Sequence, residues 1–209
     1  MQCILCGHQA HFFATARKRG YFQCENCRSV FLDPADYVPK EEEKARYQKH
    51  NNDVNDPRYQ QFVAPIVRQI RENHTPGQEG LDFGSGTGPV ISRLLRDQGY
   101  RIHTWDPFFD DHPRLLDQTY HYIACCEVAE HFHNPAAEFA TLHKLLKPGG
   151  KLYVMTRLYT PDIQFESWNY KNDETHVFFY HRHALEWIAR HLNFSKLTLH
   201  DYQLITFTA

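Results

Sequence analysis

The chain has 209 residues, of which 42% are hydrophobic and 23% charged, and its formal net charge is -2 at pH 7. A chain of this length and composition buries one good core and a small appendage rather than two full domains. The near-neutral charge gives no overall electrostatic attraction for nucleic acid, and it leaves such a partner neither indicated nor excluded. Because no stretch is apolar enough to span a bilayer and no secretion signal opens the chain, we expect a cytoplasmic protein without a membrane partner.

Four of the six cysteines form two C-x-x-C pairs near the amino terminus, Cys3 with Cys6 and Cys24 with Cys27. Each pair makes a tight knuckle that directs two thiolates at one point, and two knuckles complete the tetrahedral shell that zinc prefers. Disulfides are the alternative, but a cytosolic chain favours the metal. We therefore predict a zinc ribbon over residues 1–40, folded by its metal. The ribbon either grips nucleic acid or protein or acts as a structural clip, and the sequence leaves both open.

A polar, charged stretch follows the ribbon and is typical of a linker that carries a short helix. It places a domain boundary near residue 40, with a second domain over 41–209. Asp56 then caps a helix whose first residue is Pro57, and apolar residues recur at helical spacing as far as Ile70. Pro65 lies inside this helix and is expected to kink it.

The segment 81–90, LDFGSGTGPV, joins the end of an apolar strand to a helical pattern through Gly84, Gly86 and Gly88. Glycines are needed where the backbone turns sharply and a ligand must approach closely, and a helix start offers unpaired N–H groups to ligand oxygens. Twenty residues after Gly86, an apolar run ends in Asp106. A nucleotide-binding α/β unit places an acid at this position against ribose hydroxyls.

The remaining pattern alternates strands and helices, which predicts an α/β fold with a mostly parallel sheet and helices on both faces. The expected strands are 80–84, 101–106, 120–126 and 150–157, followed by 195–200 and 202–208, and the expected helices are 88–98, 135–146 and 182–192. Only about thirteen residues separate Asp106 from the strand that starts at 120. This distance is too short for a helix and a strand, so an abbreviated crossover is expected there.

The form D-x-G-x-G-x-G at 82–88 resembles motif I of the class I S-adenosylmethionine-dependent methyltransferases, whereas the missing third glycine of G-x-G-x-x-G disfavours a dinucleotide. Residues 122–135 and 145–154 resemble later motifs of the same superfamily. The segment 167–180, with D-x-T-H-V-x-F-F at its centre, and HNND at 50–53 resemble bacterial members with an amino-terminal zinc ribbon. The resemblance implies a Rossmann-like sheet with an antiparallel final strand pair. It also implies S-adenosylmethionine as cofactor.

The cofactor site implied by this resemblance lies around the glycine turn. The methionine end is assigned to Asp82, Gly84, Ser85, Gly86 and Gly88, and the ribose to Asp106. Phe108 either stacks on the adenine or belongs to the core. Tyr47 and His50 are expected to fold over the cofactor.

The loop beyond strand 120–126 brings Glu127, Glu130 and His131 to the edge of the sheet where ligands bind in open α/β folds. Histidine is the side chain that most often serves as a general base, so His131 suits this role. Alternatively, the Glu-His pair only fixes the loop. A third hypothesis joins these residues to His176 as a divalent-metal site, because the set resembles the magnesium site of small-RNA terminal 2′-O-methyltransferases.

Residues 167–180 are rich in aromatic and polar side chains outside any periodic element, and they include Tyr180 as a further catalytic candidate. We predict that they form a lid over a small-molecule acceptor, to a heteroatom of which the enzyme transfers a methyl group. An RNA or protein substrate recruited by the ribbon is the alternative, and a basic strip through Arg17, Lys18, Arg19 and Arg28 would favour it. Cys125 and Cys126 are interpreted as ordinary strand residues.

Overall fold

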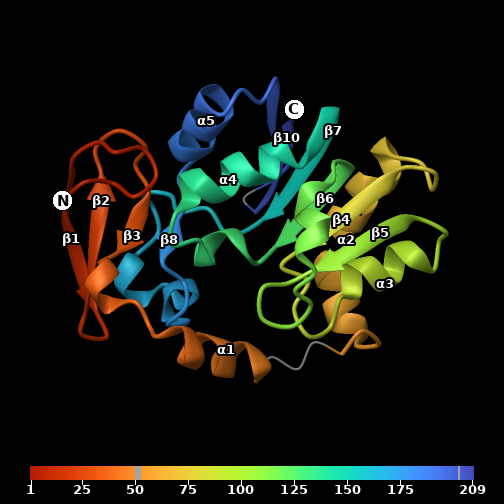
Figure 1. The fold of residues 1–209 in the computed structure, drawn as a ribbon. Helices are drawn as coiled ribbons and strands as arrows, with labels where there is room; N and C mark the ends of the chain where they lie inside the picture. The colour runs from red at the N-terminus through yellow and green to blue at the C-terminus, as the bar shows by residue number, and fades with distance from the viewer. Residues whose placement is uncertain (50–52, 202) are drawn as a thin grey trace.

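The computed structural model describes residues 1–49, 53–201 and 203–209, which form one large and one small sheet (Figure 1). The large sheet has the order β5-β4-β6-β7-β10-β9, and the small one β1-β2-β3-β8. The strands of the large sheet are β4 (Glu79–Phe83), β5 (Arg101–Trp105), β6 (Tyr120–Cys126), β7 (Leu146–Met155), β9 (Lys196–Leu199) and β10 (Leu204–Thr208). The small sheet comprises β1 (Ala10–Ala16), β2 (Arg19–Cys24), β3 (Val30–Leu32) and β8 (Phe178–Phe179).

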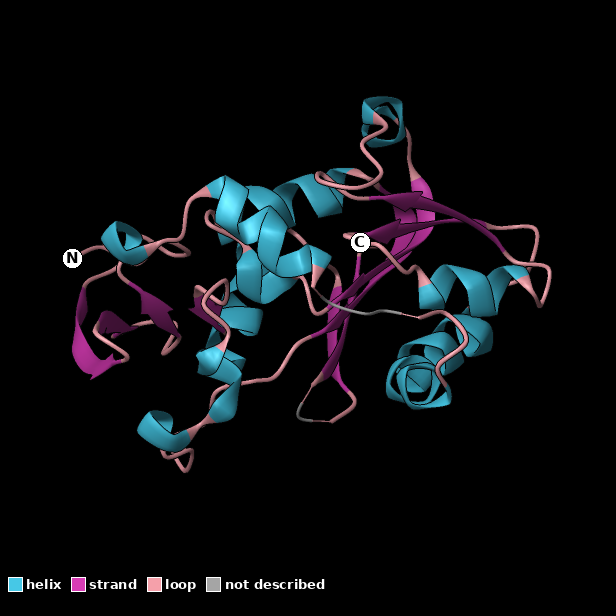
Figure 2. Ribbon diagram, turned by 90° about the horizontal axis from the view of Figure 1, so that it is seen from below, coloured by secondary structure: helices cyan, strands magenta, loops and turns pink. Residues whose placement is uncertain are grey.

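Helices cover both faces of the large sheet (Figure 2). They are α2 (Pro57–Asn73), α3 (Val90–Arg96), α4 (Pro135–Lys144) and α5 (Arg182–His191), whereas α1 (Lys40–Gln48) lies apart from both faces. Successive strand residues point to opposite faces, so Tyr122 and Ala124 of β6 pack with α2 and α3, whereas Ile123 and Cys125 pack with α4 and α5. Cys125 is therefore a core residue, as predicted.

The sheet confirms the α/β prediction. Strands β5, β4, β6 and β7 are parallel, and β10 pairs antiparallel with both β7 and β9. In the expected short crossover, the described chain forms only a 3-10 helix at Pro113–Asp117, which leaves β5 at the edge of the sheet. No helix in the described ranges has the length and apolarity needed to cross a membrane.

Several boundaries differ from the sequence prediction for local reasons. Helix α3 begins at Val90 rather than 88, because Pro89, with ψ 72°, is its non-helical cap residue. Strand β7 begins at Leu146 rather than 150, because Leu146 already pairs with Tyr120 before a register shift. Helix α2 runs through Pro65 without ending there.

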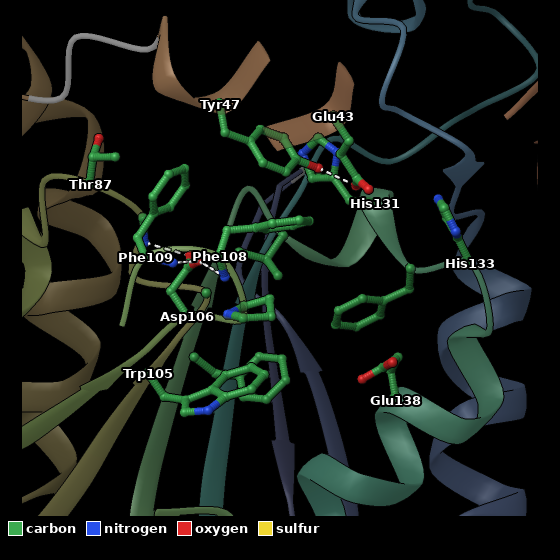
Figure 3. A pocket seen from close by; sticks show the side chains of 16 residues that line it. Glu43, Tyr47, Thr87, Trp105, Asp106, Phe108, Phe109, His131, His133 and Glu138 are labelled. Atoms are coloured by element: carbon green, nitrogen blue, oxygen red, sulfur yellow. Dashed lines mark hydrogen bonds between the residues drawn. The ribbon is translucent and has the colours of Figure 1, made fainter. Parts of the chain in front are cut away.

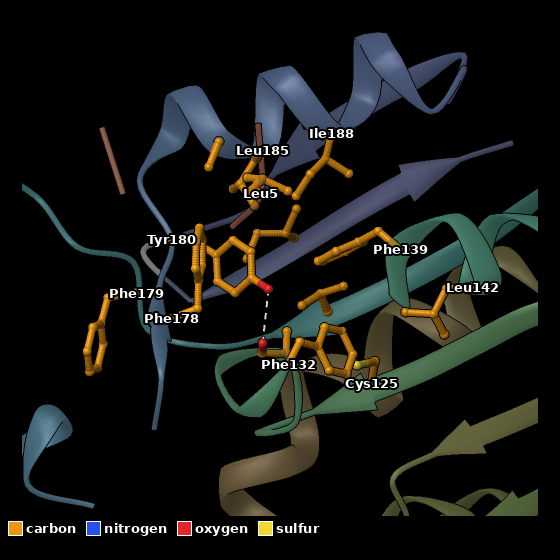
Figure 4. Close-up of a cluster of buried hydrophobic side chains, with 14 of the residues drawn as sticks. Leu5, Cys125, Phe132, Phe139, Leu142, Phe178, Phe179, Tyr180, Leu185 and Ile188 are labelled. Atoms are coloured by element: carbon orange, nitrogen blue, oxygen red, sulfur yellow. Dashed lines mark hydrogen bonds between the residues drawn. The ribbon is translucent and has the colours of Figure 1, made fainter. Parts of the chain in front are cut away.

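The small sheet is completed by a strand from the other end of the chain. Val30 and Phe31 of β3 pair with Phe179 and Phe178 of β8, which lies in the predicted lid. One hydrophobic cluster then runs from Leu5 of the ribbon to the residues that α4 and α5 bury (Figure 4). The predicted boundary near residue 40 remains a prediction, but across it the ribbon and the second domain share one core.

Candidate functional site

The turn between β4 and α3 has the backbone conformation that its glycines predict. Gly84 and Gly86 have φ angles of +75° and +63°, which residues with a Cβ rarely adopt. The N–H groups of Gly84 and Ser85 both donate to the Trp105 carbonyl, at 2.8 and 3.1 Å. A Cβ on Gly84 would lie 2.5 Å from Val128 Cγ2, so the loop beyond β6 packs directly on this glycine.

Asp106 joins this turn to the short crossover. Its Oδ2 accepts a hydrogen bond of 2.9 Å from Gly86 N, while its Oδ1 accepts from Phe108 N at 2.9 Å and from Phe109 N at 3.1 Å. The side chain is buried. A single carboxylate therefore fixes two segments beside the glycine turn, and both segments line the same cavity.

A cavity of about 350 Å³ opens at the carboxyl edge of β4, β5 and β6 (Figure 3). Of the predicted site residues, it is lined by Tyr47, Gly84, Gly86, Asp106, Phe108 and His131. Apolar walls with a few polar groups are the usual form of a small-molecule site. The cavity has other lining residues that the sequence did not predict, notably Glu43, Trp105, Phe109, Phe132, His133 and Glu138. Trp105 directly precedes the predicted Asp106 and Phe109 follows it by three residues, so their nearness in sequence could have indicated them. Glu43 and Glu138 reach the cavity only through the packing of α1 and α4.

Helix α1 closes one side of this cavity, as expected for Tyr47. The Tyr47 ring lies 5.6 Å from the Phe108 ring and 5.2 Å from the His131 ring, and its hydroxyl donates to Glu43 Oε1 at 2.7 Å. Burial, followed by the charge of Glu43, raises the pKa of the Tyr47 hydroxyl far above its ordinary value. Tyr47 is therefore a neutral phenol at this site. His50, the other residue predicted here, lies outside the described residues.

Three of the four residues in the metal hypothesis come together at the cavity edge. Ligand atoms of Glu130, His131 and His176 all lie within 4.8 Å of one another, and the two imidazole rings are 4.7 Å apart. His131 lines the cavity, whereas His176 lies behind it and is buried. Burial is the main cause that lowers the pKa of His176 to about 4, so the ring is neutral near pH 7.

Glu127 lies outside that group of three. It has φ +52°, and its side chain is half-buried, with a buried Oε1 that has no hydrogen-bond partner among the described residues. Burial, and then the nearby charge of Glu130, raises the pKa of Glu127 to about 9, so this carboxyl is protonated at neutral pH. The predicted set of two glutamates and two histidines is thus reduced to one glutamate and two histidines.

Four other predicted residues do not line the cavity. Asp82 is buried behind the turn, where its Oδ2 accepts from Ser92 Oγ at 2.8 Å and burial raises its pKa to about 6. Ser85 and Gly88 form the turn without facing the cavity. Tyr180 is fully buried in the core and donates its hydroxyl to the Ala129 carbonyl at 2.9 Å (Figure 4). The structure therefore does not bring Tyr180 to the acceptor.

The four ribbon cysteines converge on one point. Cys3 and Cys27 Sγ atoms are 3.7 Å apart, Cys6 and Cys24 Sγ atoms are 3.4 Å apart, and all six cysteines of the chain are free thiols. A tetrahedral site with Zn–S bonds of about 2.3 Å places its sulfurs about 3.8 Å apart. The donor set and its spacing therefore fit zinc.

The chain matches a family model described as a methyltransferase domain over residues 47–199. It belongs to this methyltransferase family. The match begins at Tyr47 of α1 and ends at Leu199 of β9, so it includes the glycine turn, the cavity and the predicted lid. Membership of the superfamily, predicted from motif I and the two later motifs, is confirmed.

Similar proteins agree with this assignment. The ubiquinone biosynthesis O-methyltransferase of Vibrio atlanticus (strain LGP32) is 29% identical over 77 residues, so the match spans 37% of this chain and only 32% of that relative. The solved 1,6-didemethyltoxoflavin-N1-methyltransferase of Burkholderia thailandensis has a TM-score of 0.56 at 13% identity, covering 96% of this chain and 98% of that one. Magnesium protoporphyrin IX methyltransferase from Synechocystis PCC 6803 has a TM-score of 0.54 at 15% identity, covering 80% and 94%. At these identities the two solved structures show the fold alone.

We expect Gly84→Ala to destabilise the chain by about 2 kcal/mol or more, because the left-handed backbone opposes a Cβ and Val128 occupies its space. Urea unfolding measures the change. Gly77→Ala is the matched control, since Gly77 has an ordinary φ and no heavy atom near its Cβ position. Equal stabilities of the two variants would contradict the packing of Val128 on the turn.

Proposed function

We propose that the protein transfers a methyl group from S-adenosylmethionine to a heteroatom of a small-molecule acceptor. The observation that carries this proposal is one cavity that joins the glycine turn and Asp106 to His131. Two similar folds were solved with bound S-adenosylhomocysteine, the demethylated product of this cofactor. Family membership supports the same reaction.

In this proposal each part of the cavity has a separate task. The glycine turn lets the cofactor approach the backbone, and Asp106 accepts hydrogen bonds from the ribose hydroxyls while it holds its own loop. Phe108 offers an aromatic face for the adenine. His131, at the opposite side of the cavity beneath α1, meets the acceptor, where position and proton removal assist methyl transfer.

A small acceptor is favoured by the relatives rather than by residues 167–180, none of which lines the cavity. The three similar proteins are methyltransferases named for ubiquinone biosynthesis, 1,6-didemethyltoxoflavin and magnesium protoporphyrin IX. Two members of the predicted basic strip are engaged within the chain: Arg17 donates to the Asn172 carbonyl, and Arg19 donates to the carbonyls of Lys171 and Glu174. These arginines hold the lid, which weakens the case for a nucleic-acid track on this face.

We propose further that Cys3, Cys6, Cys24 and Cys27 hold one structural zinc ion. The convergence of their sulfurs and the absence of disulfides among them support this site. Since β3 of the ribbon pairs with β8 of the lid, the metal would also stabilise the segment that carries His176.

Asp106→Ala should weaken S-adenosylhomocysteine binding about ten- to hundredfold, because it removes a charge-assisted contact of about 1.5–3 kcal/mol. Calorimetric titration measures the affinity. Asp106→Asn keeps an acceptor for the loop N–H groups and should lose less. Asp111→Ala, at an exposed position in the same loop, is the control. An affinity of Asp106→Ala equal to that of the wild type would refute the ribose assignment.

His131→Ala should lower turnover far more than it lowers S-adenosylhomocysteine affinity, because the imidazole acts on the acceptor and not on the cofactor. Transfer of labelled methyl to fractionated metabolites, with RNA assayed in parallel, gives turnover once an acceptor is found. Labelling of RNA alone would contradict a small-molecule acceptor. A parallel loss of affinity and turnover would instead assign His131 to the cofactor pocket.

By elemental analysis, purified protein should contain one zinc ion per chain that depends on the ribbon cysteines, and Cys6→Ser should lose this ion. Chelation should unfold the ribbon while most of the large sheet remains folded. Cys126→Ser is the control, because Cys126 lies on β6 outside the cluster. A zinc-free wild type, or disulfides within the two pairs, would refute the site.

A further inference from the structure

The ring orientations of His131 and His176 are fixed by backbone carbonyls. His131 Nδ1 lies 2.9 Å from the Thr175 carbonyl oxygen, and His176 Nδ1 lies 2.7 Å from that of Tyr170. A carbonyl only accepts, so each Nδ1 carries the proton and each Nε2 presents a lone pair. An imidazole held by its Nδ1–H in this way is the usual arrangement of a metal-ligating histidine.

Glu130 lies beside these two lone pairs with one oxygen unused. Its Oε1 accepts a hydrogen bond of 2.5 Å from the Tyr170 hydroxyl, whereas its Oε2 has no hydrogen-bond partner among the described residues. The side chain is fully buried. A buried carboxylate oxygen without a partner is costly, because it has lost its water and gained nothing in return.

The three residues do not satisfy one another directly. His176 Nε2 and Glu130 Oε1 are 3.9 Å apart, which is too long for a hydrogen bond, and neither imidazole Nε2 carries a proton to donate. Ligand atoms of all three residues nevertheless lie within 4.8 Å of one another. Only a cation or a proton donor between them resolves this arrangement.

We propose that His131 and His176, each through Nε2, and a carboxylate oxygen of Glu130 bind one divalent first-row transition-metal ion at the wall of the cavity. Two imidazoles and one carboxylate suit Mn²⁺, Fe²⁺, Co²⁺ or Zn²⁺ better than Mg²⁺, which prefers oxygen ligands. Metal–ligand bonds of about 2.1 Å place ligand atoms about 3.0–3.4 Å apart, so a small contraction of the group suffices. His131, which is only half-buried, has room to make this adjustment.

This site rests on the proposed function for its role. Three protein ligands leave open positions, and His131 lines the cavity, so an oxygen atom of the acceptor would complete the shell. The cation would then orient that oxygen toward the methyl group and favour its deprotonated form, with the proton released to solvent. The acceptor class is accordingly one that presents a hydroxyl or another oxygen donor.

The test measures Mn²⁺ binding to the full-length chain with its ribbon loaded with zinc. Mn²⁺ is the weakest binder of the series and does not displace zinc from four thiolates. The decrease in the electron paramagnetic resonance signal of free Mn²⁺ therefore counts only the ions that bind outside the ribbon. We expect one Mn²⁺ per wild-type chain and at least tenfold weaker binding in His176→Asn and Glu130→Gln. His191→Asn, on the exposed face of α5, is the matched control and should bind as the wild type does.

Circular dichroism and ribbon zinc content verify that each variant is folded, and His131→Asn replaces Glu130→Gln if the buried substitution prevents folding. A wild type purified with two zinc ions per chain, one of them lost in His176→Asn, supports the same site. No second ion in the wild type, or equal binding in His176→Asn, overturns it. Calorimetry with S-adenosylhomocysteine is independent of this measurement, so failure of the metal site and failure of the proposed function are distinguishable.

Discussion

The backbone of Val177 is one point at which the small sheet is joined to the loop beyond β6. Its N–H donates to the Glu130 carbonyl in the loop beyond β6, at 2.9 Å, and its carbonyl accepts from Leu32 N of the ribbon, also at 2.9 Å. The residue is buried. One residue therefore fixes the predicted lid against the loop beyond β6 on one side and against the ribbon on the other, and His176 is its immediate neighbour.

Further contacts hold the same segment from α1 and from Arg17 and Arg19 of the ribbon, which donate to its backbone carbonyls. Arg46 of α1 pairs with Asp173 at 2.7 Å, and Asp173 Oδ1 in turn accepts from Thr175 N and Oγ1. The Thr175 carbonyl orients His131. The ribbon and α1 thus act on the cavity indirectly, by fixing the backbone carbonyls that set the direction of the two imidazoles.

The loop beyond β6 carries unfavourable features that packing must offset. Glu127 has a positive φ, and Glu127 and the fully buried Glu130 each carry one buried carboxyl oxygen without a hydrogen-bond partner among the described residues. Features of this kind cost about 1–3 kcal/mol apiece and persist where the surrounding structure over-determines them. Their concentration at the edge of the cavity agrees with a functional site, because a loop selected for stability alone would avoid them.

The sequence by itself determined the α/β sheet, the glycine turn, the position of Asp106 at the end of a strand, the short crossover and the two C-x-x-C motifs. Each of these depends on local spacing, which a strand, a turn or a C-x-x-C knuckle imposes within a few residues. It also indicated that His131 and His176 belong together, since the strand end and the lid have few places to meet.

Only the tertiary structure decided which predicted residues reach the cavity. In the structure, Asp82 accepts a hydrogen bond from Ser92 and Tyr180 donates one to Ala129, so neither lines the cavity. Glu127 lies outside the group formed by Glu130, His131 and His176. Glu43 of α1 and Glu138 of α4 line the cavity instead. The tertiary structure also paired β8 with β3 across most of the chain length. These outcomes depend on side-chain direction and on contacts between segments far apart in sequence, which local periodicity does not encode.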